Sequence, residues 1–242
     1  MTSKSRQNSP TIKQLCNLAG VVLSVLSGLS FEQVQYLLNK KSVLKKKLAS
    51  TFEVPADIYA GLRVEWERFY LDHFRIAVDF SEVHIPEKPN EGLWRPIFVA
   101  QGLSLNSTLA VMRDVFPKVW TYSEDLDANV PTNTRTSAQS YVVWVRDGVE
   151  PDQEFLGKST READMDGKVG VTFLERLVFG VKLFVEKKEH LDVRGITLCT
   201  ASRSIDGGVP CVYFYPNTGE VIMFWYFVDY SYASFGLRQA VS

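Results

Sequence analysis

Hydrophobic positions recur every three or four residues in the first part of the chain, which is the spacing of one helix face. From residue 11 the repeat is carried by Leu15, Leu18, Val22, Val25, Leu26 and Leu29. Ser30 and Gln33 have the spacing of a capping box, which predicts that a second helix starts there. A short helical piece is expected over 43–48. A fourth helix is expected from about Asp57, with a buried stripe formed by Ile58, Leu62, Trp66, Phe69 and Phe74.

From Val78 onward, short runs of β-branched and aromatic residues alternate with two helical patterns. Strands are expected at 97–100, 141–145, 196–199, 209–215 and 220–227, and helices at 108–116 and 174–185. The last two strands flank Pro216-Asn217-Thr218-Gly219, a typical turn composition that predicts a hairpin. The pattern indicates an α+β fold. We therefore expect a flexible tail at 1–9, a helical bundle at 10–77, and at 78–242 a mixed, largely antiparallel sheet with two packing helices.

The composition is that of a globular chain, with 45% hydrophobic residues in 242. Only three cysteines occur, Cys16, Cys199 and Cys211, too few for a disulfide framework or a four-thiolate zinc site. This favours a reducing compartment, and we expect a cytoplasmic protein. The uncharged run at 14–31 imitates a signal peptide, but it contains polar residues and is shorter than a membrane span. We expect a buried helix there and no membrane contact.

Charge is distributed unevenly along the chain. Residues 1–60 carry eight Lys or Arg and three Asp or Glu, whereas the remainder carries nineteen and twenty-five. Five lysines follow the second predicted helix: Lys40, Lys41, Lys45, Lys46 and Lys47. Because lysines neutralise phosphates, this segment is a candidate nucleic-acid interface. On one continuous helix, however, they scatter around the axis, so a solvated surface is the simpler alternative.

Charged residues also gather at the ends of predicted strands, where sites often form. The acid, base or metal-ligand candidates are Asp147, Glu150, Asp152, Glu175, His190 and Asp206, and the anion-binding candidates are Arg146 and Arg203. If they converge on one cleft, they supply carboxylates for metal-assisted hydrolysis of a phosphodiester and arginines for its anion. The alternative is a set of salt bridges that order the loops.

Other motifs are weaker. Cys199, His190 and Asp192 have the residue types of a Cys-His-Asp catalytic triad. The simpler interpretation of Cys199 is a small apolar residue in a buried strand. An acidic stretch at 162–167 resembles half of a calcium loop, yet Phe173 stands where the bidentate Glu should be. Nucleotide-binding and hydrolase motifs do not occur in the sequence. We expect no metal site and no cofactor.

Several motifs together resemble a known family. They are Tyr141-Val-Val-Trp-Val-Arg-Asp147, Thr172-Phe-Leu-Glu-Arg176, His190-Leu-Asp192, Thr197-Leu-Cys-Thr-Ala-Ser-Arg203 with Asp206-Gly and Val209-Pro210, and Ser123-Glu-Asp-Leu-Asp127. The chain is similar over about residues 66–242 to a family of uncharacterised proteins abundant in bacteria of the candidate phyla radiation. The resemblance implies a bacterial, cytoplasmic protein and brings no established activity.

Three functional hypotheses follow. The first is a non-enzymatic binding or regulatory protein that contacts nucleic acid or a protein partner through its basic N-terminal helices, and the second is the hydrolase described above. The third is a protein–protein interaction module whose exposed aromatic residues form the interface: Tyr226, Tyr230, Tyr232 and Phe235. The pattern does not specify an oligomeric state.

Overall fold

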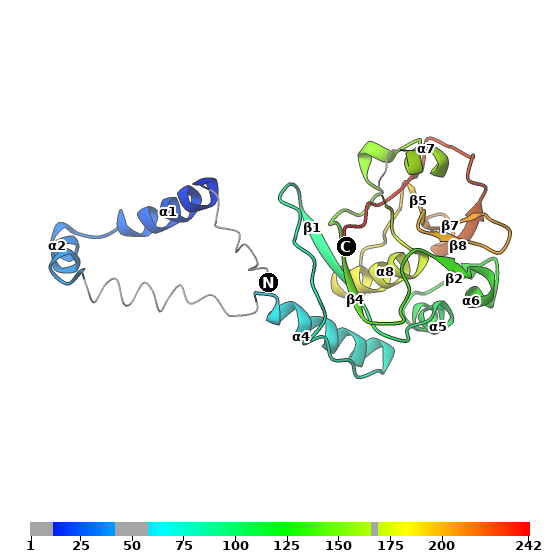
Figure 1. Cartoon of the computed structure of the whole chain (residues 1–242), viewed down its shortest axis with the longest axis horizontal. Coiled ribbons are helices and arrows are strands. Elements are labelled where there is room, and N and C mark those ends of the chain that lie inside the picture. The colour runs from blue at the N-terminus through cyan, green and yellow to red at the C-terminus, as the bar shows by residue number, and fades with distance from the viewer. Residues whose placement is uncertain (1–11, 42–57, 166–168) are drawn as a thin grey trace, which may run out of the picture. The chain divides into compact units, whose positions relative to one another are not determined.

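The computed structural model describes residues 12–41, 58–165 and 169–242. The chain divides into two compact units, Met1–Ile58 and Tyr59–Ser242, which we call the N-terminal unit and the body (Figure 1). The tail predicted at 1–9 and the helical piece predicted at 43–48 lie outside the described residues.

The N-terminal unit contains α1 (Ile12–Leu26) and α2 (Phe31–Asn39), both as predicted. The capping box at the start of α2 is present, because the Ser30 amide donates to Gln33 Oε1 at 2.8 Å and the Gln33 amide donates to Ser30 Oγ at 3.3 Å. The expectation of a buried first helix is wrong, since Val21 and Leu23 are more than 60% exposed. Among the described helices, none combines the length and apolar character needed to cross a membrane.

The body contains helices and strands in alternation. Its helices are α4 (Ala60–Phe69), the π-helix η1 (Tyr70–Phe74), α5 (Leu105–Val115), α6 (Leu126–Asn129), the 3₁₀ helix η2 (Gln153–Phe155), α7 (Thr160–Met165) and α8 (Phe173–Lys187). Its strands are β1 (Trp94–Val99), β2 (Val119–Thr121), β3 (Thr132–Asn133), β4 (Tyr141–Arg146), β5 (Ile196–Leu198), β6 (Ser202–Arg203), β7 (Val209–Tyr215), β8 (Glu220–Tyr226) and β9 (Phe235–Gly236).

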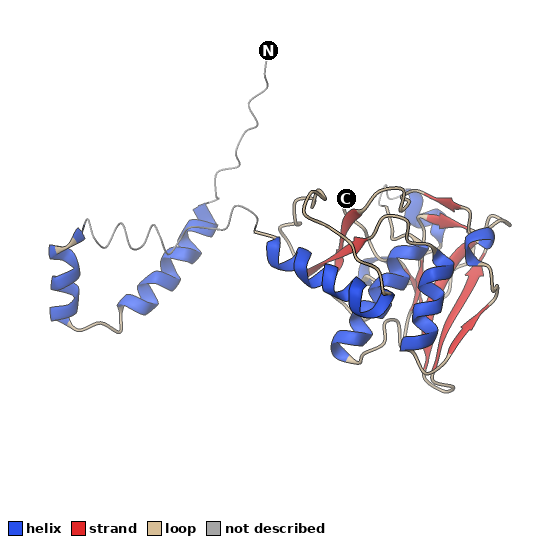
Figure 2. Cartoon of the chain, turned by 90° about the horizontal axis from the view of Figure 1, so that it is seen from below, coloured by secondary structure: helices blue, strands red, loops and turns tan. Residues whose placement is uncertain are grey.

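The largest sheet has the strand order β2-β8-β7-β5-β9. Its two outer pairs, β2 with β8 and β5 with β9, are parallel, and its two inner pairs are antiparallel. Strands β1 and β4 form a separate antiparallel ribbon, as do β3 and β6. Figure 2 shows strands of the large sheet at the right side of the body, with helices to their left. The predicted α+β class, with a largely antiparallel sheet and packing helices, is confirmed, as is the β7–β8 hairpin.

Helix α8 is the centre of the body. Its first eleven residues, 173–183, are all buried, which is far more than the single apolar stripe that the sequence predicts. Thr172 and Glu175 form a capping box at its start, with Thr172 Oγ1 accepting from the Glu175 amide at 3.2 Å. Three charged side chains of the helix, Glu175, Arg176 and Lys182, are therefore inside the protein and each requires a partner.

The body begins at Tyr59, and the predicted boundary between residues 77 and 78 is wrong. Helix α4 belongs to the body instead of an N-terminal bundle, because Trp66 and Phe69 are buried in its core. The π-helix that follows brings the Tyr70 hydroxyl to the backbone of β1, where it donates to the Phe98 carbonyl at 2.7 Å. Ile58, expected on the buried stripe, is 65% exposed.

The segment after β9 connects the two larger sheets. Val241 and Trp144 exchange backbone hydrogen bonds of 2.8 and 2.9 Å, which attaches the segment to strand β4. Strand β9 itself pairs with β5. Residues 235–241 therefore lie across both sheets and fix their relative positions.

Candidate functional site

The predicted catalytic carboxylates are dispersed, and four of the five, Asp147, Glu150, Asp152 and Glu175, have partners of their own. Asp147 accepts from Arg95 Nε at 2.8 Å, and Asp206 is exposed on the turn after β6. Glu150 accepts from the amides of Arg194 and Gly195, at 3.1 and 2.8 Å. Within the described parts of the chain, no three His, Cys, Asp or Glu side chains come together as metal ligands. The convergent cleft expected of a metal-assisted hydrolase is not formed by these residues.

Glu175 is fully occupied by interactions inside the body. Its carboxylate accepts from Arg135 Nε and Nη2 at 2.7 and 2.8 Å and from the Tyr141 hydroxyl at 2.9 Å. It also accepts from the Thr172 amide, which completes the capping box of α8. Burial, and next the negative charge of Glu175, raise the pKa of Tyr141, so its hydroxyl stays a donor. The cluster anchors the loop that carries Arg135 to the start of α8.

Asp152 and the two candidate anion-binding arginines also have structural partners. Asp152 accepts from the Gln239 amide at 2.7 Å, and burial raises the pKa of its carboxyl. Arg146 pairs with Glu154 at 2.7 Å and lies over the ring of Trp94. Arg203 donates to the carbonyl of Thr200 at 2.6 Å. These side chains hold loops in place.

Asp192 forms a buried cluster with two arginines. Its Oδ2 accepts from Arg176 Nε at 2.8 Å, and its Oδ1 accepts from Arg238 Nη2 at 2.6 Å. Burial alone would raise the pKa of Asp192, but the charges of Arg176 and Arg238 outweigh it and hold the pKa below its usual range. Arg238 also donates to two backbone carbonyls, those of Gly148 and Val149. Asp192 therefore joins α8, β5 and the segment after β9.

The Cys199, His190 and Asp192 set does not form a nucleophilic triad. Cys199 is completely buried, and that burial raises the pKa of its thiol well above the usual value. His190 stacks on Phe214, and Asp192 is committed to its two arginines. Cys211 is buried as well, and all three cysteines are free. The default interpretation of Cys199 as a core residue fits this environment.

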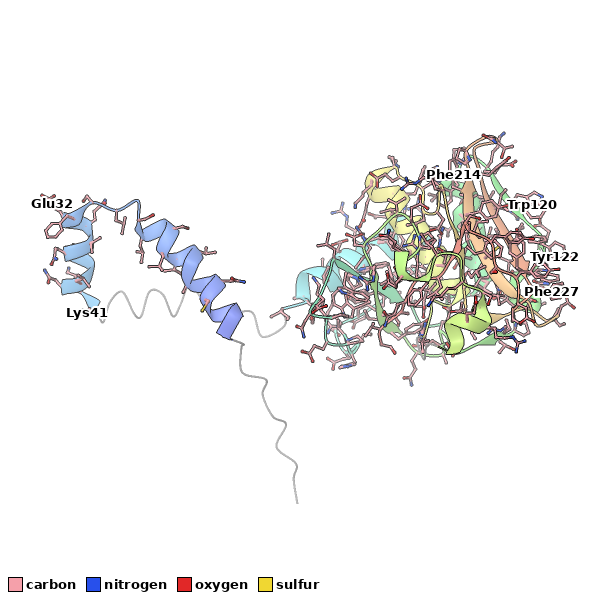
Figure 3. All side chains as sticks on the ribbon, turned by 90° about the horizontal axis from the view of Figure 1, so that it is seen from above. Glu32, Lys41, Trp120, Tyr122, Phe214 and Phe227 are labelled. Carbon is pink, nitrogen blue, oxygen red and sulfur yellow. The ribbon has the colours of Figure 1, made fainter. Side chains whose placement is uncertain are left out.

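Two of the five candidate nucleic-acid-binding lysines are described. Lys40 and Lys41 are exposed in the N-terminal unit, and Lys40 Nζ lies 4.9 Å from the ring centroid of Tyr36. Figure 3 shows Lys41 at the end of α2 opposite Glu32 at its start. Lys45, Lys46 and Lys47 fall outside the described residues, so the candidate nucleic-acid interface stays a prediction.

An open cleft of about 670 Å³ lies beside the loop at 148–151. Its lining includes Glu150, Gln153 and Arg194. Glu150, the carboxylate at this cleft, already accepts hydrogen bonds from two backbone amides. The cleft therefore has room for a small molecule but lacks a set of free reactive groups that point into it.

Nine aromatic rings on and around strands β2, β8 and β9 form one contact network, which we call the aromatic cluster. Its members are Trp120, Tyr122, Phe224, Trp225, Tyr226, Phe227, Tyr230, Tyr232 and Phe235. Neighbouring ring centroids are 4.6 to 6.5 Å apart. Figure 3 shows Trp120, Tyr122 and Phe227 along the same side of the body.

Five of these rings are exposed to a degree that is unusual for such large apolar side chains. Their exposed fractions are 45% for Trp120, 54% for Tyr122, 51% for Phe227, 47% for Tyr230 and 56% for Tyr232. A contiguous exposed apolar patch of this kind marks an interaction surface more often than scattered single residues do. The cluster is therefore the strongest candidate site in the described structure.

Sequence reasoning identified part of this cluster. Tyr230 and Tyr232 are exposed as proposed, but Phe235 is only 1% exposed because β9 pairs with β5 and turns this ring into a small second core. Trp120 and Tyr122 were missed, since they lie about 100 residues earlier, in and directly after a strand of three residues. No protein-family model matches this chain, and no curated protein or solved structure matches it either.

Proposed function

We propose that this chain is a non-enzymatic binding protein whose body docks a protein partner through the aromatic cluster. The observation that carries the proposal is the group of five exposed rings within one network of nine. Tyr, Trp and Phe are enriched at the centres of protein interfaces, where a few such side chains supply most of the binding energy. Rings that already pack against one another lose little conformational freedom on binding.

The charges near the cluster favour a neutral, apolar partner surface. Arg161 is paired with Asp229, on the loop that carries Tyr230. Lys118, just before Trp120, donates to the Thr218 carbonyl at 3.2 Å. A nucleic-acid surface combines stacking rings with a basic groove, and these cations have partners on the protein itself. The arrangement supports a protein partner over a nucleic acid at this face.

The basic N-terminal helices are a separate hypothesis. Lys40 and Lys41 are exposed, which is what a phosphate contact requires, and the three free cysteines favour a reducing cytoplasm. A salt series of binding to DNA and RNA, with a Lys41→Ala, Lys45→Ala, Lys46→Ala variant, tests this role. If the unaltered chain binds nucleic acid in a salt-sensitive way and the variant does not, the result supports a nucleic-acid-binding role for the N-terminal helices. If the unaltered chain does not bind nucleic acid, that role is excluded and the proposal for the body is unaffected.

Site-specific photocrosslinking tests the proposed docking surface. A benzophenone amino acid is placed at Trp120 or at Phe227 in the full chain, and at Leu93 as a control, since Leu93 is 78% exposed but has no contact with the cluster rings. Irradiation of cells that produce the chain is expected to give a discrete protein adduct from the two cluster positions and none from Leu93. No adduct from the cluster positions, or the same adducts from all three, would overturn the proposal.

A further inference from the structure

We infer that the protein partner is a second copy of this chain, which pairs edge to edge through strand β2. The inference rests on the proposed function, because it assigns the occupant of the same aromatic face. It begins with a difference between the two edges of the large sheet. A strand at the edge of a sheet presents unpaired N–H and C=O groups that attract another strand unless they are covered.

The β9 edge is covered by the chain itself. The Gly157 amide donates to the Phe235 carbonyl at 2.7 Å, and the Asp152 amide donates to the Leu237 carbonyl at 3.0 Å. Pro151 packs so closely on Gly236 that a Cβ there would lie 2.7 Å from the Pro151 side chain. No further strand has room to add at this edge.

The β2 edge has no such cover in the described structure. Lys118 and Tyr122 bond to β8, through Val221 N–H to Lys118 O at 3.0 Å and Tyr122 N–H to Met223 O at 3.2 Å. Because alternate residues of an edge strand direct their backbone groups to opposite sides, those of Val119 and Thr121 point away from β8. Neither residue has a backbone hydrogen bond to any described residue beyond β8. Proline and charged side chains, which usually protect an edge, do not occur between 119 and 121.

A two-fold axis at Trp120 allows all the free backbone N–H and C=O groups of Val119 and Thr121 to form hydrogen bonds. In an antiparallel pairing centred there, Val119 lies opposite Thr121 of the second copy, and each such pair exchanges two hydrogen bonds. The two Trp120 residues face each other as a non-hydrogen-bonded pair, in which side chains approach most closely. Residues directly opposite share one face of the sheet, so the aromatic clusters of both copies join into one continuous surface.

The charges near the strand are compatible with this symmetry. An interface between identical copies brings the same patch of both copies together, so an unpaired charge near the axis lies close to the identical charge of the second copy. In the register centred on Trp120, Lys118 lies opposite Tyr122 of the second copy and not opposite another lysine. No like-charged residues oppose one another from 118 to 122.

The test is the mass of the purified full chain in solution across a concentration series, measured by sedimentation equilibrium. The unaltered chain is expected to form a dimer. Thr121→Pro removes the outward N–H, which β8 does not use, and should weaken dimerisation about tenfold or more through two lost hydrogen bonds. Thr121→Val keeps the N–H, loses only the hydroxyl, and should dimerise normally.

Trp120→Glu is the second variant, because it replaces an exposed side chain and leaves the backbone unchanged. It places two like charges at the axis and should also give a monomer, with an unchanged circular dichroism spectrum. A chain that is monomeric at all concentrations, or a dimer that persists in both variants, would overturn the inference. The mass of the photoadduct separates this inference from the proposed function. An adduct from Trp120 with twice the chain mass supports self-pairing, an adduct of another mass supports only the proposed function, and no adduct from either Trp120 or Phe227 would overturn both.

Discussion

The imidazole of His190 lies flat on the ring of Phe214, with centroids 3.7 Å apart and planes 8° from parallel. Phe184 and Phe116 also contact the imidazole, at centroid distances of 4.8 and 5.6 Å. His190 Nδ1 is buried and has no hydrogen-bond partner among the described residues. Burial, reinforced by the positive charge of Arg176, lowers the pKa of His190. The histidine proposed as a catalytic base is thus a half-buried ring that packs between aromatic side chains.

The stability of the body should fall as the pH drops below about 6.5, the usual pKa of histidine. Below that pH the unfolded chain takes up a proton at residue 190 while the folded chain does not, so the free energy of unfolding decreases until the pH reaches the lowered folded pKa. The slope is at most about 1.4 kcal/mol per pH unit for one group. Urea unfolding at several pH values between 8 and 5 measures it.

His190→Phe should reduce this slope and leave a protein at least as stable at pH 7, because it removes the unpartnered nitrogen and keeps the ring stack. His84→Asn is the matched control, since His84 is exposed. His73 also has a pKa lowered mainly by burial, so some slope should remain in His190→Phe. Equal slopes in the unaltered chain and in His190→Phe would contradict the lowered pKa of His190.

Asp192→Asn should destabilise the body by about 3–5 kcal/mol, because it leaves Arg176 and Arg238 buried together without a counter-charge. Asn keeps the size of the side chain and tolerates the left-handed backbone at this position, where φ is 58°. Arg176→Met should cost less, since the Arg238–Asp192 pair is retained. The free energy of unfolding in urea measures both, with the exposed Asp206→Asn as control. The reverse order of the two costs would show that Arg238 alone does not satisfy Asp192.

Two helical glycines should respond to alanine with opposite signs. Gly61, in α4, has open space around the position that a methyl group would take, so Gly61→Ala should stabilise the body by about 0.5 kcal/mol through helix propensity. In α8, a Cβ at Gly180 would lie 2.9 Å from Arg176 Nη1. Because Asp192 holds that guanidinium in place, Gly180→Ala should cost about 1–3 kcal/mol. Thermal unfolding measures the change in stability of both variants. A stabilised Gly180→Ala would mean that the Arg176 side chain can move.

Thiol labelling should distinguish one fast cysteine from two protected ones. Cys16 is exposed, whereas Cys199 and Cys211 are completely buried and burial raises the pKa of both thiols. A chromogenic disulfide reagent should therefore react at once with a single thiol in the folded chain and with all three in denaturant. Cys16→Ser should abolish the fast phase. Fast labelling of a second thiol would show that the core around β5 and β7 opens readily.

The elements that the sequence predicted well are those whose signals are local. The β7–β8 hairpin has two strands rich in β-branched and aromatic residues and a turn composition within eighteen residues, and α8 has a long periodic pattern with a capping box. Strand β2 escaped prediction because three residues carry no periodicity and their partner, β8, lies about 100 residues further along the chain. Its exposed Trp120 was missed with it.

The burial of charged residues could not be predicted for a similar reason. Glu175 and Arg176 follow a polar pattern that normally faces solvent, yet their partners Arg135, Asp192 and Arg238 come from distant segments. The sequence places charges at strand ends but does not say which of them pair. Most of the candidate catalytic groups form salt bridges or hydrogen bonds within the body. The exposed aromatic side chains are not covered by another segment of the described structure and are therefore available for binding.

Residues 235–241 complete the edge of the large sheet, supply Arg238 to Asp192 and bridge to Trp144, and every one of these partners precedes them in the chain. A nascent body therefore cannot close its core while this segment is still inside the ribosome. Until then the emerging polypeptide exposes apolar surface to chaperones and proteases.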